Sequence, residues 1–480
     1  MPAGKPLTIK EFAGLDLRRV NSSSDPKSQR VLKNAYVTNG KGIRNRPGTV
    51  AIAQAHPSSK GLFAANGLLY SVAPAGYPAI AQTASPDLRY LFIGDGGGYD
   101  IDHITALSGS EIIGTTPIGQ GIPYVSILNK KGIYEHHYGD IEPASLTDIP
   151  NTLVGLPFAP SAGLLKLASR LWAPSDTSGV VHFSSILQGP RDWEEPADAG
   201  FIPVSKNTPG DRVIQGLGYI RDRMIVAFED SLQMWAVDES PDNITLVEIL
   251  NGPGTKYERA LENVLGDSFY FSNGGFRSLI TSTIEGQREE SDIGVKIQEI
   301  TNLLPTDPEP VSVWSQTRGQ YICSFGNTLL VFTYIPSEKT FGWSEWDMPY
   351  SVTDLVESKG VLYCRDTNGV VRKFDDDLTS DDAAEFTWRF QTQFIGQDEK
   401  ARLWNFTDVG FSMIGEASVY LYPDFRNPDA RIFMGKINDS STPFERMYLS
   451  TVAPSVALAL EGTGHLQLDS LAIRLEELAV

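Results

Sequence analysis

The densest group of potential metal ligands in the sequence is the acidic segment DDDLTSDDAA, residues 375–384. Its carboxylates are of the oxygen type that calcium prefers, but the segment lacks the spaced ligands and the central glycine of a calcium loop. We therefore interpret it as a solvated linker, expect no metal there, and place a domain boundary in it. The carboxylates concerned are Asp375, Asp376, Asp377, Asp381 and Asp382.

Three further groups could carry chemistry. His136 and His137 are adjacent, so on a strand they point to opposite faces and cannot bind one metal together. The stretch IGDGGGYD, residues 93–100, lacks the glycine spacing of a phosphate loop and has no clear helix after it, so a hairpin loop is expected. Cys323 and Cys364 have no C-x-x-C spacing, which predicts two buried thiols in a protein folded in a reducing cytoplasm.

The stretch FSSILQGPRDW, residues 183–193, resembles the aspartate-box turn of sialidase propellers but lacks its Asp-x-Gly centre. Such a turn is structural and carries no catalysis. No Ser-His-Asp order or nucleophile elbow is present in the sequence. We therefore expect no enzyme, no catalytic residue and no cofactor, although the 59 acidic residues leave chance carboxylate pairs open.

Charge is divided unevenly along the chain. The first 50 residues hold ten Lys and Arg and three acids, whereas the whole chain has a net charge of −19. This pattern predicts a basic arm that docks on an acidic surface, such as that of a neighbouring copy, through Arg18, Arg19, Arg44 and Arg46. A solvated terminus is the alternative. The acidic body argues against tight binding of DNA, which requires cationic contacts to phosphates.

The elements that must position these residues are short strands. Apolar runs of four to seven residues alternate with Gly, Pro, Asp and Ser turns, which is typical of antiparallel hairpins. Such units begin near residues 124, 164, 213, 261, 314 and 352, a spacing of about 40–50 residues that matches four-stranded propeller blades. We predict an all-β chain with a β-propeller of about six to eight blades over residues 51–380. The best helix candidate is residues 291–304, with Ser291 as N-cap.

The two ends of the chain differ from this middle part. Residues 1–50 are expected to form an extended arm pinned at a few points. Residues 385–480 contain about seven alternating strands and predict a β-sandwich, with a bulge where the alternation slips at Asp469 and Ser470. No run of about 18 apolar residues is present, so no bilayer span is expected. The N-terminus lacks an apolar signal core, so Sec export is not expected either.

Two stretches resemble a known family. They are GLDLRRVNSSSDPKSQRVLKNAYVTNGKGIRNRPGT, and SRLWAPSDTSGVVHFSSILQGPRDW with the following VIQGLGYIRDRMIVAFEDSLQMW. They are similar to β-propeller proteins of bacteriophage tails, most strongly to the tail nozzle (tail tubular B-type) or head-completion and DNA-stabilisation proteins of short-tailed phages. The resemblance covers roughly residues 12–375 and rests on structural patterns rather than catalytic motifs.

This resemblance implies a structural virion protein that is assembled in the host cytoplasm. It implies a homo-hexameric ring below the portal and adaptor, a channel that retains and then releases double-stranded DNA, and attachment surfaces for fibre or tip proteins. Two alternatives stay open: a propeller glycan hydrolase or depolymerase, and a receptor-binding tail module without a channel. Six copies would give the basic arm a repeated acidic neighbour.

Overall fold

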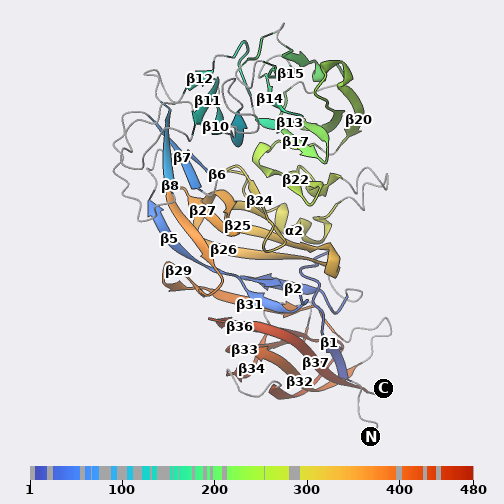
Figure 1. The fold of residues 1–480 in the computed structure, drawn as a ribbon. Helices are drawn as coiled ribbons and strands as arrows, with labels where there is room; N and C mark the ends of the chain where they lie inside the picture. The colour runs from blue at the N-terminus through green and yellow to red at the C-terminus, as the bar shows by residue number, and fades with distance from the viewer. Residues whose placement is uncertain are drawn as a thin grey trace.

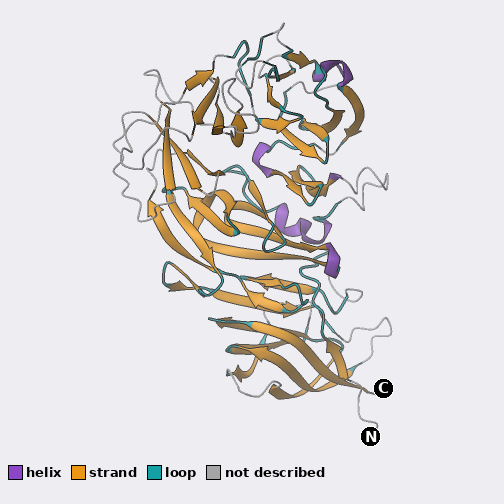
Figure 2. Ribbon diagram, in the orientation of Figure 1, coloured by secondary structure: helices purple, strands orange, loops and turns teal. Residues whose placement is uncertain are grey.

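The computed structural model confirms the all-β prediction (Figure 1 and Figure 2). Helical turns are short: η2 (Val204–Asn207), η3 (Pro241–Asn243), η4 (Glu258–Ala260), η5 (Val295–Ile297), α2 (Gln298–Thr301) and η6 (Pro336–Glu338). None of the helices in the described residues is long and apolar enough to cross a membrane. The structure describes residues 6–18, 25–54, 60–65, 68–74, 88–93, 105–111, 122–129, 132–137, 152–154, 156–161, 163–175, 179–187, 192–194, 198–207, 213–252, 254–279, 292–395, 403–424, 427, 430–438 and 445–478.

The middle of the chain forms a series of small antiparallel sheets, each made of consecutive strands. Three have four strands and one has three, and each chain segment turns back on its neighbour, as the hairpin pattern predicts. The strands are β9 (Thr105–Glu111), β10 (Ile122–Asn129), β11 (Gly132–His137) and β12 (Thr152–Val154); β13 (Leu165–Leu167), β14 (Arg170–Pro174), β15 (Val181–Phe183) and β16 (Gly200–Ile202); β17 (Gly216–Ile220), β18 (Arg223–Ala227), β19 (Ser231–Ala236) and β20 (Thr245–Asn251); and β21 (Leu261–Val264), β22 (Asp267–Ser272) and β23 (Gly275–Ser278).

Consecutive sheets pack face to face. The strand β17 contacts β13 and β14 on one side and β21 and β22 on the other. All residues of β22 and most of β18 and β19 are buried, because both faces of these strands are covered by neighbouring sheets. Trp172 and Met224 belong to one apolar cluster, and Ile225 and Tyr270 belong to the next. Burial of both faces explains why the sequence shows continuous apolar runs here rather than strict alternation.

A large sheet follows, built on the strands β24 (Val311–Ser315), β25 (Gln320–Ile335), β26 (Thr340–Ser358), β27 (Val361–Asp366) and β28 (Val370–Asp375). The strand β5 (Gly48–Gln54) pairs antiparallel with β28, so segments more than 300 residues apart share one sheet. Near it lie β6 (Lys60–Ala65), β7 (Leu68–Pro74) and β8 (Leu88–Ile93), with β7 and β8 parallel. The short strands β29 (Ser380–Asp381) and β30 (Ala384–Glu385) extend the sheet beyond β5.

The C-terminal part is a two-layer sandwich whose layers both contain strands from the first 50 residues (Figure 1). One layer has the order β3-β4-β37-β32-β35, with β1 also paired to β37. The other has the order β2-β31-β36-β33-β34 and is continuous with the large sheet through a parallel contact of β2 with β26. The strands are β1 (Pro6–Ile9), β2 (Gln29–Lys33), β3 (Ala35–Val37), β4 (Ile43–Asn45), β31 (Thr387–Thr392), β32 (Trp404–Ile414), β33 (Ala417–Tyr422), β34 (Ile432–Ile437), β35 (Glu445–Ala453), β36 (Ala457–Thr463) and β37 (Gln467–Glu477).

This sandwich corrects the expectation of an arm pinned at a few points. Phe12, Leu32 and Ile43 are at most 3% exposed and lie in the same core as Trp388 and Val409. The N-terminal segment is therefore an integral part of the C-terminal domain. β3 and β4 pair with each other, but β1, β2 and β4 have partners at the other end of the chain, and these partners cannot be recognised from local sequence.

Two local predictions have different outcomes. The bulge is confirmed: Ser412 pairs with Ser470 and Met413 pairs with Leu468, so Asp469 is the extra residue. Of the helix predicted over residues 291–304, the structure contains a shorter helical stretch, η5 followed directly by α2, from Val295 to Thr301. Ile297 is buried in the apolar core and Ile293, Ile300 and Leu304 pack against it, which accounts for the helical spacing. Ser291 lies outside the described residues.

The N-terminal segment crosses β26 at a very close approach between two glycines. Gly14 has a φ of +76°, and a Cβ built on it would lie 2.6 Å from the Cα of Gly342. Leu15 N donates to the carbonyl of Trp343, and Gln29 N donates to the carbonyl of Gly14. Any side chain at position 14 would break this packing.

We therefore expect Gly14→Ala to lower the free energy of unfolding by ~2–4 kcal/mol, because the new methyl group meets backbone atoms and φ is positive. Gly40→Ala is the matched control, since a Cβ on Gly40 meets nothing within 4 Å. Urea unfolding followed by tryptophan fluorescence measures both. Equal stability of the two variants would contradict the described path of the N-terminal segment.

Candidate functional site

Arg46, one of the four arginines expected to contact a partner, is fully buried in its own chain. Its Nη1 and Nη2 donate to the two carboxylate oxygens of Asp381. Nε donates to Asn34 Oδ1 at 2.9 Å, and the remaining N–H groups donate to the carbonyls of Pro47 and Asp347, both at 3.0 Å. All five guanidinium donors are therefore satisfied internally. This corrects the partner-contact prediction for Arg46.

The groups around this ion pair also form hydrogen bonds and ring contacts within the chain. Asn34 accepts from Asp347 N at 2.8 Å and donates through Nδ2 to the carbonyl of Thr387 at 2.8 Å. Thr49 Oγ1 donates to Asp381 at 2.8 Å. The ring of Phe386 covers the guanidinium, with 3.8 Å between the ring centroid and the guanidinium carbon. The cluster thus joins the N-terminal segment to the large sheet and to the sandwich.

The other three arginines are placed differently. Arg18 is half-exposed and forms an ion pair with Asp16, with 2.8 Å between Nη2 and Oδ2. Arg44 lies on β4, where it pairs across the sheet with Tyr36 and Gln467. Arg19 lies outside the described residues. A role of Arg18, Arg19 and Arg44 in contacts with another molecule stays a prediction.

The acidic segment, residues 375–384, is held by cations of the same chain. Arg318 forms two hydrogen bonds to Asp376, of 2.9 and 2.8 Å. Arg372 Nε donates to Asp382 at 2.6 Å. The interpretation as a solvated linker holds only in part: Asp376, Asp377 and Asp382 are exposed, but Asp381 is buried and the segment is fixed by these ion pairs. Across the described ranges, no group of three or more His, Cys, Asp or Glu side chains is placed to hold a metal.

The stretch over residues 183–193 is organised by an aspartate that lies beyond it. Asp198 accepts from Ser185 Oγ and from the backbone N–H groups of Ile186 and Leu187. Burial raises the pKa of Asp198, but these bonds and Arg170 outweigh burial and hold it below its usual value. The buried Arg170 donates to Asp198 and to the carbonyls at 184 and 239. The motif is structural, and its carboxylate comes from a later loop that no local spacing reveals.

The two cysteines, the histidine pair and the glycine-rich loop are the remaining candidates from the sequence. Cys323 and Cys364 are free and fully buried, as predicted. Burial raises the pKa of the Cys364 thiol to about 12, so the thiol is unreactive at neutral pH. His136 and His137 end β11, and their side chains lie outside what the structure describes. Residues 94–100 of the glycine-rich loop also lie outside the described residues.

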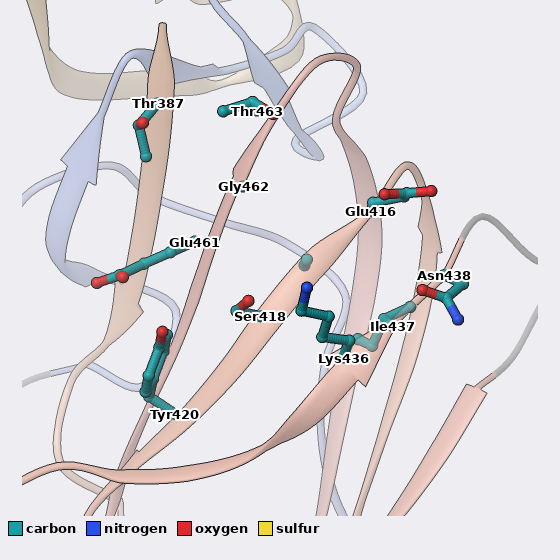
Figure 3. Close-up of a pocket in the computed structure, with 11 residues that line it drawn as sticks. Thr387, Glu416, Ser418, Tyr420, Lys436, Ile437, Asn438, Glu461, Gly462 and Thr463 are labelled. Atoms are coloured by element: carbon teal, nitrogen blue, oxygen red, sulfur yellow. The ribbon is translucent and has the colours of Figure 1, made fainter.

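A surface hollow of about 270 Å³ lies on the outer face of the sandwich layer that contains β31, β36, β33 and β34 (Figure 3). A row of paired residues crosses this face: Lys436 is opposite Ser418, which is opposite Glu461, which is opposite Arg389. The lining is completed by Thr387, Glu416, Ala417, Tyr420, Ile437, Asn438, Gly462 and Thr463. Figure 3 shows Ser418, Glu461 and Lys436 projecting from neighbouring strands on this side of the sheet.

Sheet geometry gives this face its shape. The register of β33 against β34 shifts between Val419 and Tyr420, next to Gly435, which has a φ of +146°. Such a bulge bends the edge strand and strengthens the local twist. Val419 and Leu421 of β33 lie in the apolar core, and by the alternation of a strand Ser418 and Tyr420 lie on the opposite, outer face. The cross-strand neighbours could not be foreseen, because they depend on tertiary pairing.

Glu262 is a carboxyl group with a strongly raised pKa. Glu262 on β21 has its pKa raised from 4.5 to about 8, chiefly because burial disfavours the charged form. A hydrogen bond from the backbone of Asn263 opposes this rise only in part. The protonated form is therefore favoured in the folded protein below about pH 8.

Comparisons with known proteins give distant structural similarities only. No protein-family profile and no curated protein matches the chain. Among solved structures, the computationally designed Ika8 protein is 12% identical with a TM-score of 0.39, over 69% of this chain and 99% of that one. BamB from Moraxella catarrhalis is 10% identical with a TM-score of 0.32, over 69% and 97%. Hsv2 from Kluyvelomyces marxianus is 8% identical with a TM-score of 0.32, over 66% and 95%. At these values the similarities carry no argument about function.

We expect Arg46→Met to lower the free energy of unfolding by ~3–5 kcal/mol, because it leaves the carboxylate of Asp381 buried without its partner. Arg18→Met, which removes a half-exposed ion pair, should cost less than ~1 kcal/mol. Urea titration of both variants measures the difference. Similar losses in the two variants would contradict the assignment of Arg46 as the internal connector.

The raised pKa of Glu262 predicts a pH dependence with a definite sign. Between the unfolded pKa near 4.5 and the folded pKa near 8, the folded state binds more protons, so stability falls as pH rises. We compare the free energy of unfolding of Glu262→Gln with that of the wild type. This difference should shift in favour of the variant by ~1–3 kcal/mol between pH 5 and pH 8. Thermal or urea unfolding at both pH values checks this. A difference that is independent of pH would show that Glu262 is already ionised when folded.

Proposed function

We propose that the protein is a structural, non-enzymatic component of the short tail of a bacteriophage. In this proposal residues 51–380 close into a β-propeller of about six to eight blades, and copies of the chain assemble into a ring. The ring forms a nozzle through which double-stranded DNA is retained and then released. Adaptor and fibre or tip proteins are its expected neighbours in the virion.

One observation carries the propeller part of this proposal. The strand β5, at the start of the segment, pairs with β28 at its end over the whole length from Gly48–Asp375 to Gln54–Val370. A closed ring of blades needs such a joint, because the first and last blades must be held together. The face-to-face packing of the intervening small sheets supports the same arrangement.

The phage part of the proposal rests on the sequence resemblance, and the structure indicates how the resembling residues are used. Arg170, Trp172 and Phe183 of that pattern are buried, and Arg170 connects three loops. They are therefore framework residues, as expected for a family whose shared pattern builds blades rather than a catalytic centre. The strongly acidic body suits a conduit wall, since it repels DNA phosphates rather than holding them.

The full-length protein should form a ring of about six copies, measured by mass photometry and negative-stain imaging over a range of concentrations. Imaging of the assembled particle, with this chain labelled, should place it on the tail axis. A chain that stays monomeric under all conditions would contradict the proposal. Location only at fibre tips would favour a receptor-binding module, and turnover of host polysaccharide, abolished by one carboxylate substitution, would favour a hydrolase.

A further inference from the structure

The hollow on the outer face of β31, β36, β33 and β34 contains two kinds of polar side chain. Some already form ion pairs or ring contacts with other residues of the protein. Arg431 forms an ion pair with Glu461, with 3.1 Å between Nη1 and Oε1, and Arg389 approaches the same oxygen at 3.1 Å. Arg431 also lies over the ring of Tyr420, with 4.6 Å between the guanidinium carbon and the ring centroid. These contacts fix one wall of the hollow.

The other polar side chains that line the hollow are available to a ligand. Within the described residues, the side chains of Glu416, Ser418 and Lys436 make no hydrogen bond or ion pair with the protein, and neither do Thr387, Asn438 and Thr463. Together they offer one carboxylate, one ammonium, one amide and three hydroxyl groups. A ligand that replaces their water must therefore both donate and accept hydrogen bonds at several points.

This chemistry excludes several classes of ligand. An apolar ligand would leave the charged side chains without hydrogen-bonding partners. A phosphate polymer would meet Glu416 beside the single uncommitted cation, Lys436. A divalent metal needs a cluster of carboxylate or imidazole ligands, and none is found in the described part of the chain.

We propose that the hollow binds a short saccharide. Sugar hydroxyl groups donate and accept, so they match Glu416 as acceptor, Lys436 and Asn438 as donors, and Ser418 as both. The rings of Tyr420 and the half-exposed Phe433, whose centroids are 5.6 Å apart, provide an apolar surface beside the polar groups. The volume of about 270 Å³ is close to the lower end of ligand pockets, about 300 Å³, which suits a short saccharide. This inference goes beyond the proposed function and rests on the hollow alone.

The test uses the full-length protein on an array of neutral and acidic oligosaccharides, followed by calorimetric titration with the best-bound glycan. Lys436→Ala and Glu416→Gln should each weaken binding about tenfold or more, as expected for hydrogen bonds to charged groups. Lys10→Ala and Glu385→Gln are matched controls, because both residues are exposed and neither lines the hollow. The controls should bind as the wild type does.

Absence of binding to any saccharide at millimolar concentration would overturn the proposal. Equal affinity of the wild type and both hollow variants would also overturn it, because the glycan would then bind elsewhere. Circular dichroism and the thermal midpoint confirm that the exposed substitutions leave the fold intact. Ring assembly is measured on the same samples, so a protein that assembles but binds no glycan fails this inference alone. Loss of assembly in the hollow variants would instead identify the hollow as a contact between copies, which contradicts the saccharide.

Discussion

The architecture depends on one buried ion pair, between Arg46 and Asp381. A guanidinium inside a protein is costly unless all of its donors are paired, and here the five donors are paired with groups from three parts of the chain. Because those partners belong to the N-terminal segment, β26 and the connection before β31, the cost of burying the charge is offset only when all three are in place. The pair thus couples the packing of the large sheet to that of the sandwich.

The same principle organises other joints of the molecule. Asp354 is nearly inaccessible and lies between Arg259 and Arg365, with Thr353 donating to its second oxygen at 2.9 Å. Arg170 plays the corresponding part between loops around Asp198. Arg46 and Arg170 each lie where backbone carbonyls from separate segments converge, which a lysine could not satisfy with comparable geometry. Arg170 connects the sheet of β13–β16 to the segment after β19, and Arg259 connects η4 to β26.

Features set by residues close in sequence could be predicted, whereas contacts between residues far apart in the chain could not. The hairpins around β22–β23 and β27–β28, the buried cysteines and the bulge at Asp469 all follow from alternation and turn residues close in sequence. The partnership of Arg46 with Asp381, and of Ser185 with Asp198, carries no such signal. The excess of basic residues in the first 50 positions predicts a surface feature, whereas Lys33 and Arg46 neutralise acids of the same chain.

The pairing of β1 with β37, from Pro6–Arg474 to Ile9–Leu471, has a consequence for biosynthesis. The ribosome delivers the first strands of the sandwich long before the last strand exists, so they wait without partners while the intervening sheets emerge and fold. Pairings between such distant segments also form slowly, because loop closure is needed before any contact is gained. The domain can therefore form only after β37 has been synthesised, and translation products that stop before β37 would lack it.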